Sequence, residues 1–151
     1  MKSTMGLKLA AAAFVAAGVI GAVGAGSAAA ASNRRFKGTA EGVITGFTPP
    51  ATLDADATGT ATHLGNFTRH EQITLGAGGS ISGKITFVAA NGDKLKASVS
   101  GQLNPATGDA TGTYTFTGGC GRFSDATGSA AFTAHTNFVT MSASFDGTID
   151  Y

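Results

Sequence analysis

The chain has 151 residues, of which only 13% are charged, and its formal net charge is +1 at pH 7. Charge this sparse and scattered excludes the basic surface with which proteins bind nucleic acid or anionic lipid. The single cysteine, Cys120, excludes an internal disulfide, so packing and hydrogen bonds must hold the fold.

Residues 1–31 are predicted to form a cleaved signal peptide. Lys2 and Lys8 provide a positive start, the apolar run 9–23 follows, and the small residues 29–31 form an Ala-x-Ala cleavage site. A single membrane anchor is the alternative, but the apolar run is shorter than the ~20 residues that a spanning helix needs. We therefore expect a secreted or periplasmic (extracytoplasmic) protein with no membrane attachment after cleavage.

Residues 32–151 are predicted to form a single all-β domain. Without the two lysines of residues 1–31, eight Lys and Arg remain against nine Asp and Glu, a net charge of −1. No segment shows helical periodicity, and short alternating runs rich in Thr, Phe, Val and Ile are separated by Gly, Asn, Asp and Pro. The predicted strands lie near residues 36–47, 57–64, 67–75, 80–89, 93–103, 109–117, 128–135 and 138–150.

The hairpin over residues 81–103 turns at Ala90-Asn91-Gly92. A two-residue Asn-Gly turn would place Phe87 opposite Lys96 and mix apolar with polar faces. A three-residue loop, with Gly92 in the left-handed conformation, places Phe87 opposite Leu95 and likewise Ile85 opposite Ala97. Because a slip of one residue moves every side chain to the other face, the apolar pattern favours the three-residue loop.

The last predicted strand alternates strictly, so that one of its faces is apolar. That face comprises Val139, Met141, Ala143, Phe145 and Ile149. Such alternation indicates an antiparallel sheet that is buried on one side. About eight strands of this kind form a closed barrel or a two-sheet sandwich. We favour a small closed antiparallel barrel, because closure removes exposed strand edges.

The phrase Asp-Ala-Thr-Gly occurs at 56–59, 109–112 and 125–128, and Pro-Ala-Thr-Gly occurs at 105–108. Asp, Thr and Gly are common in turns and at strand entries, so the phrase is predicted to mark a recurrent corner of the fold. Its spacing does not fit calcium, because an EF-hand needs alternating oxygen ligands closed by a distal Glu.

The most specific segment is 118–129, in which four glycines lie around Cys120. These glycines are Gly118, Gly119, Gly121 and Gly128. They allow positive φ or close backbone approach, which indicates a structural bend. Phe123 and Phe132 are expected to anchor the core, and Cys120 is expected to be buried as a small apolar residue. Arg122 is expected to point outward or to pair with Asp125, and the functional alternative is that it holds an anionic ligand at a pocket rim.

This segment also carries a family resemblance. It reads Gly118-Gly119-Cys120-Gly121-Arg122-Phe123, followed by Ala126-Thr127-Gly128 and a last hairpin. It resembles the Gly-Gly-x-Gly-x-Phe signature of the allene oxide cyclase and dirigent barrels, and it is similar to small exported bacterial proteins of unassigned role. The resemblance covers roughly residues 80–150. It implies a barrel in which the glycine-rich segment bends the chain, and it carries over no catalytic residue.

The densest polar cluster contains His63, Arg69, His70 and Glu71. A hairpin could bring His63 and His70 together, but a zinc site needs a third ligand, and the spacing predicts neither His135 nor Glu71 in that role. We therefore predict no metal.

Neighbours on a strand point to opposite faces, which disfavours His70 with Glu71 as an acid–base pair. His63 or His70 working with a carboxylate remains an alternative, and the candidate partners are Asp54, Asp56 and Glu41. The candidate ligand-binding residues are Arg122, His63, His70 and Glu71.

Two functions follow from this sequence. No nucleophile elbow, phosphate loop or dinucleotide fingerprint is present, so no cofactor is predicted. The first function is a non-enzymatic barrel that binds a small apolar ligand in its mouth or acts as an envelope or interaction module. The second, implied by the resemblance, is an isomerase or cyclase. A Phe-filled interior favours a structural module, whereas a cavity of ~300 Å³ or more with convergent charged groups favours a ligand or an enzyme.

Overall fold

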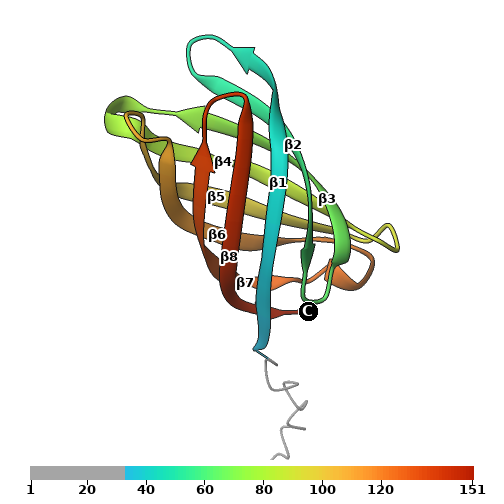
Figure 1. Cartoon of the computed structure of the whole chain (residues 1–151). Helices are drawn as coiled ribbons and strands as arrows, with labels where there is room; N and C mark the ends of the chain where they lie inside the picture. The colour runs from blue at the N-terminus through green and yellow to red at the C-terminus, as the bar shows by residue number, and fades with distance from the viewer. Residues whose placement is uncertain (1–32) are drawn as a thin grey trace, which may run out of the picture. The chain divides into compact units, whose positions relative to one another are not determined.

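The computed structural model describes residues 33–151, and the signal peptide predicted over 1–31 lies outside the described residues. Eight antiparallel strands form one closed barrel, in which each strand pairs with its sequence neighbours and β1 pairs with β8 (Figure 1). The all-β closed barrel is therefore confirmed. The strands are β1 (Arg34–Thr48), β2 (Thr52–Ala61), β3 (Gly65–Leu75), β4 (Ser80–Ala89), β5 (Lys94–Asn104), β6 (Asp109–Cys120), β7 (Thr127–Thr136) and β8 (Thr140–Asp150).

Two short 3₁₀ turns complete the described chain, η1 (Ala77–Gly79) and η2 (Gly121–Phe123). In residues 33–151 no helix is long and apolar enough to span a membrane. The turns at 62–64, 90–93 and 121–126 lie at one end of the barrel, which we call the closed end. The turns at 49–51, 76–79, 105–108 and 137–139 lie at the other end, which we call the open end.

The β4–β5 hairpin has the predicted three-residue loop. Phe87 pairs with Leu95, and Ile85 pairs with Ala97. Gly92 has a φ of 89°, the left-handed conformation that the loop requires. The buried face of the hairpin thus decided its register, as the apolar pattern predicted.

Two strand boundaries differ from those predicted. The second strand runs from Thr52 to Ala61, and the residues from 62 to 64 form a turn. The last strand begins at Thr140, and Val139 is 66% exposed, so its predicted place on the inner face is wrong. The Asn137 side chain accepts hydrogen bonds from the backbone N–H groups of Val139 (2.9 Å) and Thr140 (2.7 Å), which makes this segment a turn.

Inward-facing glycines lie opposite phenylalanine rings inside the barrel. The cross-strand pairs are Gly38 with Phe145, Gly59 with Phe67 and Gly112 with Phe132. A Cβ at Gly112 would lie 2.8 Å from the Phe132 ring, and one at Gly59 would lie 2.8 Å from the Phe67 ring. These glycines make room for rings that would otherwise not fit the narrow interior.

This packing corrects the interpretation of the repeated phrase. Residues 56–59 lie within β2, whereas 105–108 form a turn, 109–112 begin β6 directly after that turn, and 125–128 lead from a turn into β7. The prediction of a recurrent corner is therefore wrong at 56–59. At Gly59 a Cβ would meet the Thr39 backbone carbonyl oxygen of the neighbouring strand as well as the Phe67 ring, so close packing rather than a turn requires this glycine.

The prediction that Cys120 is buried is also wrong, because its side chain is exposed. Ala97 pairs with Phe116 but Leu95 pairs with Gly119, so β6 carries an extra residue opposite Lys96. Gly118, with a φ of 99°, lies in this bulge. A bulge reverses the alternation of faces, so Cys120 points outward although simple alternation from Phe116 points it inward.

Candidate functional site

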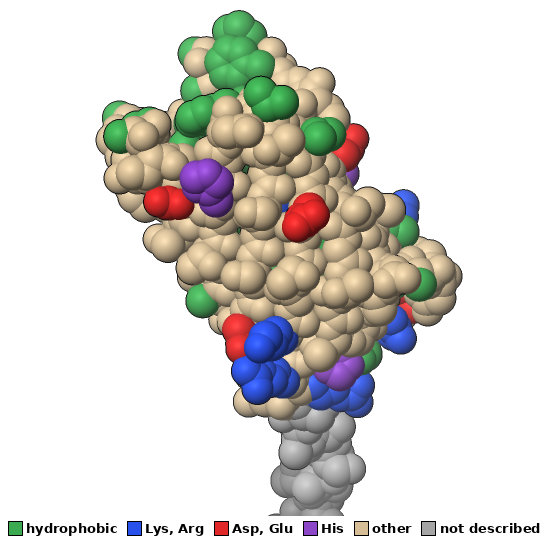
Figure 2. Space-filling model, viewed as in Figure 1, with side chains coloured by type: hydrophobic (Ala, Val, Ile, Leu, Met, Phe, Trp, Pro, Cys, Tyr) green, Lys and Arg blue, Asp and Glu red, His purple; other side chains and the backbone are tan. Residues whose placement is uncertain are grey.

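A cavity of about 80 Å³ enters the barrel at the open end. Its walls are nearly all apolar and come from every strand of the barrel. They include Ile44, Leu53, Ala55, Ile73, Leu75, Ile81, Val99, Leu103, Ala110, Phe132, Ala134 and Met141. Hydrophobic side chains also gather on the outside of this end, at the top of the view in Figure 2. The large exposed ones of residues 33–151 are Val43, Phe47, Phe138 and Val139.

Phe138 lines the mouth of this cavity in an unusual backbone conformation. Its φ is 65°, in the left-handed region that non-glycine residues seldom occupy. The Thr136 hydroxyl oxygen accepts a hydrogen bond from the Phe138 N–H at 2.9 Å, and Asn137 holds the next two residues of the turn. Side-chain hydrogen bonds thus hold the turn that places this ring at the mouth.

Arg69, Glu71 and Tyr114 form the polar floor of the cavity. The Arg69 guanidinium donates a hydrogen bond from Nη1 to the Tyr114 hydroxyl at 3.2 Å. Its Nη2 lies 3.1 Å from Glu71 Oε2. In residues 33–151, Arg69 and Glu71 are the charged side chains that are buried. We call these three residues the floor cluster.

Burial controls the charges of the floor cluster. Desolvation raises the pKa of Glu71, and the nearby Arg69 charge opposes that rise only in part. Desolvation also raises the pKa of Tyr114, which therefore keeps its hydroxyl proton. The Arg69 guanidinium lies 5.8 Å from the centre of the Phe87 ring and 5.9 Å from that of Tyr114, so two aromatic faces flank its charge.

The hydrogen-bonding capacity of Arg69 is not fully used. Its Nε and Nη2 atoms are buried and have no hydrogen-bond partner among the described residues. Nη2 is near the Glu71 carboxylate in distance, but its N–H groups are not aligned for a hydrogen bond. Unsatisfied buried donors are costly and rare in native proteins, and a ligand-binding or catalytic role is one of the explanations for them, beside strain and ordered water.

The alternation of β3 explains how Arg69 and Glu71 come to lie inside. Phe67, Arg69, Glu71 and Ile73 are all odd-numbered and share the inward face. Glu71 was among the candidate ligand-binding residues predicted from the sequence, whereas Arg69 and Tyr114 were not. The sequence did contain a signal for Arg69. Phe67 and Ile73 are apolar and share one face of the strand, so Arg69, which lies between them on the same face, is expected to point inward as they do.

His70 and His63 are not brought together by the fold. His70 faces outward from β3, and its Nδ1 lies 2.7 Å from Asp56 Oδ1 on β2, so a histidine–carboxylate pair does form on the surface. His63 lies in the β2–β3 turn at the closed end, with its Nε2 3.1 Å from the Arg35 carbonyl oxygen. His70 and Glu71 point to opposite faces, as expected.

Arg122 lies at the closed end, where it joins three turns. Its guanidinium donates to the His63 carbonyl oxygen in the β2–β3 turn, and its Nε lies 3.6 Å from Asp93 Oδ2 in the β4–β5 turn. Arg122 thus points outward as expected, but the partner observed is Asp93 rather than Asp125. The next residue, Phe123, is fully buried and plugs this end of the barrel, as the predicted core anchor.

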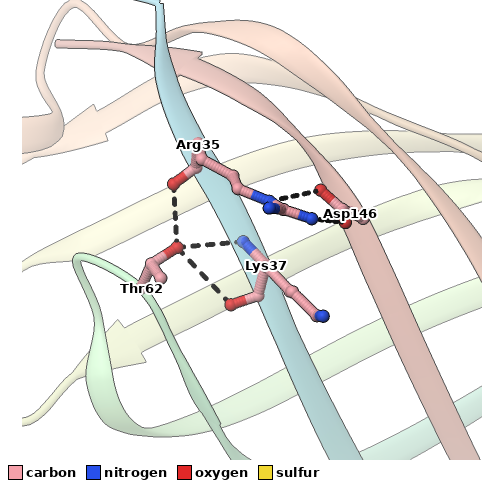
Figure 3. Close-up of polar contacts among 4 residues, drawn as sticks. All are labelled: Arg35, Lys37, Thr62 and Asp146. Carbon is pink, nitrogen blue, oxygen red and sulfur yellow. Dashed lines mark hydrogen bonds and ion pairs between the residues drawn. The ribbon is translucent and has the colours of Figure 1, made fainter.

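Further contacts fasten the closed end around β1 (Figure 3). The Thr62 hydroxyl donates to the Arg35 carbonyl oxygen at 2.9 Å and accepts from the Lys37 N–H at 2.9 Å. The Arg35 guanidinium pairs with Asp146 on β8, with 2.6 Å between Nη2 and Oδ2. The candidate residues at this end, Arg122 and His63, therefore serve to hold turns together.

Across residues 33–151 no three His, Cys, Asp or Glu side chains lie close enough together to hold a metal ion. The chain matches no protein-family model, no curated protein and no solved structure. The resemblance of residues 118–128 to the allene oxide cyclase and dirigent barrels therefore stays a prediction without support from a relative.

Proposed function

We propose that this protein, after export and removal of residues 1–31, binds a small apolar ligand in the open end of its barrel. One observation carries the proposal: an apolar cavity ends on a buried polar cluster whose hydrogen bonds are incomplete. An apolar pocket with a few convergent polar groups is typical of small-molecule sites. The exposed apolar residues of the open end extend the apolar surface beyond the mouth.

The cavity also limits the size of the ligand. Its volume is about 80 Å³, well below the ~300 Å³ of a site for a drug-sized ligand. A water occupies about 30 Å³ in the liquid, and an apolar cavity of about 150 Å³ holds benzene, so a ligand with one ring fits only if part of it extends through the mouth onto the exposed apolar residues of the open end. From the sequence we expected a ligand site or an enzyme to have both a large cavity and convergent charged groups. The charged groups are present, but the cavity is small.

Titration with α-methylstyrene, a hydrocarbon of one ring, tests the proposal by NMR. We expect shifts confined to the methyl groups that line the cavity, such as those of Ile73, Leu103 and Met141. Ala110→Leu should abolish these shifts, because its larger side chain fills the cavity. Ala97→Leu, which enlarges a buried residue away from the cavity, is the matched control. Absence of binding to the unmodified protein by ligands of this size would refute the proposal.

An isomerase or cyclase is the second candidate function. It is favoured by Glu71, a carboxyl group at the cavity floor whose burial raises its pKa toward the range useful for proton transfer. Incubating the protein with small-molecule extract of its host in D₂O tests this candidate. Deuterium uptake into a compound by the unmodified protein, but not by Glu71→Gln, would establish proton transfer, and equal uptake by both would refute it.

A further inference from the structure

We infer that the ligand of this site is an uncharged apolar molecule with one hydrogen-bond acceptor, such as a ketone or aldehyde carbonyl. The Arg69 guanidinium donates a hydrogen bond to that acceptor. The inference rests on the proposed function and names the chemical class of its ligand. Three observations carry it: the unused donors of Arg69, the charge already present beside it, and the small apolar cavity above it.

The first observation concerns acceptors. A guanidinium has five N–H donors and no acceptor. Of the described residues, Tyr114 receives one hydrogen bond from Nη1, whereas Nε and Nη2 have no hydrogen-bond partner. Because the side chain of Arg69 is fully buried, bulk water does not serve these donors. The floor cluster therefore lacks at least one acceptor atom.

The second observation concerns charge. Glu71 Oε2 lies 3.1 Å from Arg69 Nη2, so the positive charge already has a negative partner inside the barrel. A ligand carboxylate would bring a second buried negative charge next to Glu71, at a high desolvation cost. A carbonyl oxygen supplies an acceptor without a charge. The site thus lacks an acceptor and not an anion.

The third observation concerns access. The Arg69 guanidinium lines the floor, but its Nε and Nη2 atoms are covered in the ligand-free barrel. A ligand acceptor reaches them only after a small rearrangement of the floor. We therefore expect association slower than the diffusional limit of about 10⁸–10⁹ M⁻¹s⁻¹ for a small molecule.

Three ligands of nearly the same shape test the inference. Acetophenone carries a carbonyl group, α-methylstyrene replaces its oxygen with a CH₂ group, and benzoate carries a charge. We expect acetophenone to bind at least about tenfold more tightly than α-methylstyrene, since a hydrogen bond to a charged donor in a desolvated site has that effect. Benzoate should bind more weakly than acetophenone.

The Arg69 side chain itself provides a readout in the unmodified protein. The ¹⁵N–¹H signal of Nε or Nη2 should move downfield on addition of acetophenone by more than on addition of α-methylstyrene, whose ring has the same ring-current effect but accepts no hydrogen bond. In the double variant Arg69→Met/Glu71→Met the preference for acetophenone should disappear. Arg35→Met/Asp146→Met removes an arginine–carboxylate pair from the outer surface and should leave that preference unchanged.

The outcomes separate the inference from the proposed function. Equal binding of acetophenone and α-methylstyrene would overturn the inference, because ordered water then serves Arg69, and would leave the function standing. Tightest binding of benzoate would also overturn it, in favour of an anion site. Unchanged Nε and Nη2 signals of Arg69 with bound acetophenone would exclude Arg69 as the donor. If none of the three compounds binds, the proposed function fails together with the inference.

Discussion

Phenylalanine rings fill the barrel at its closed end, whereas mainly aliphatic side chains line the open end and leave a cavity. Phe36 packs edge-on against Phe116 at 4.9 Å and is stacked on Phe145 at 5.3 Å. Phe123 then plugs the end, with its ring 4.8 Å from that of Tyr151. At the open end, isoleucine and leucine side chains line the cavity together with three alanines, Ala55, Ala110 and Ala134.

The two ends also differ in how their turns are held. At the closed end, Arg122 and Thr62 connect turns with one another and with β1. At the open end, the side chains of Thr136 and Asn137 hold the β7–β8 turn from within, and the Val139 carbonyl oxygen accepts a backbone hydrogen bond from the Ile44 N–H of β1 at 2.9 Å. The floor cluster lies where the two packings meet. One end is therefore filled by rings and fastened by cross-links between turns, and the other end contains the cavity.

Loss of a ring at the closed end should have the largest effect on stability. Phe36→Ala removes a fully buried ring that contacts two others, so we expect a loss of about 3–5 kcal/mol in the free energy of unfolding. Chemical denaturation measures it. Phe47→Ala, at an exposed position of the open end, should change stability by less than about 0.5 kcal/mol. Similar losses at both positions would contradict the contrast between the ends.

Breaking the floor cluster from one side should be nearly as damaging. Arg69→Met leaves the Glu71 carboxylate buried without its counter-charge, and we expect a loss of about 3–4 kcal/mol at neutral pH. The double variant Arg69→Met/Glu71→Met should recover most of that loss, since replacing a whole buried pair by apolar side chains is often neutral. If the double variant is as unstable as the single one, the pair is not coupled.

Enlarging a small buried side chain should affect stability less at the open end than deeper in the barrel. Ala110→Leu extends into the cavity and should change stability by less than about 1 kcal/mol, because the space for its extra carbons exists. Ala97→Leu, between Ile85 and Phe116 in the sheet, should lose about 1–3 kcal/mol through overpacking. Denaturation of the two variants measures the difference. A larger loss in Ala110→Leu would show that the open end is as tightly packed as the closed end.

The fold was predictable because its signals are local. The alternation along each strand and the loop at Gly92 depend only on residues that are neighbours in the sequence. The strands and the hairpin register predicted from them agree with the structure. The exposure of Cys120 was not predictable, because the bulge at Gly118 arises from pairing with Lys94 and Leu95 on another strand. The repeated phrase misled for a similar reason, since Gly59 is explained by the Phe67 ring across from it.

The candidate site was predictable only in part. Glu71 was singled out because it lies in a polar cluster, but alternation alone does not tell whether that face of β3 points inward. Arg69 became a floor residue through its contact with Tyr114, which is 45 residues away on β6. The cavity itself is what remains after all eight strands have placed their side chains, so no single segment encodes it.

The smallest predicted effect is a dependence of stability on pH that originates at the floor cluster. Burial raises the pKa of Glu71 in the folded protein, so this group favours the folded state below its unfolded pKa of about 4.3. That contribution to stability is lost as the pH rises through the higher pKa that Glu71 has in the folded protein. Glu71→Gln keeps a hydrogen-bonding side chain but cannot ionise. The unmodified protein should therefore lose stability relative to Glu71→Gln as the pH is raised from 4 toward neutrality.

Urea denaturation of both proteins at a series of pH values measures this difference. Asp109 and Asp146 act with the opposite sign, because hydrogen bonds from His135 and Arg35 lower the pKa of each carboxyl, and their contribution is lost as the pH falls. Both groups are exposed and present in both proteins, so they cancel in the comparison. A difference that stays constant with pH would mean that the pKa of Glu71 is the same in the folded and unfolded protein. The Arg69 charge would then offset the whole effect of burial, or water would solvate the carboxylate, and the floor would lack the raised pKa that favours proton transfer by Glu71.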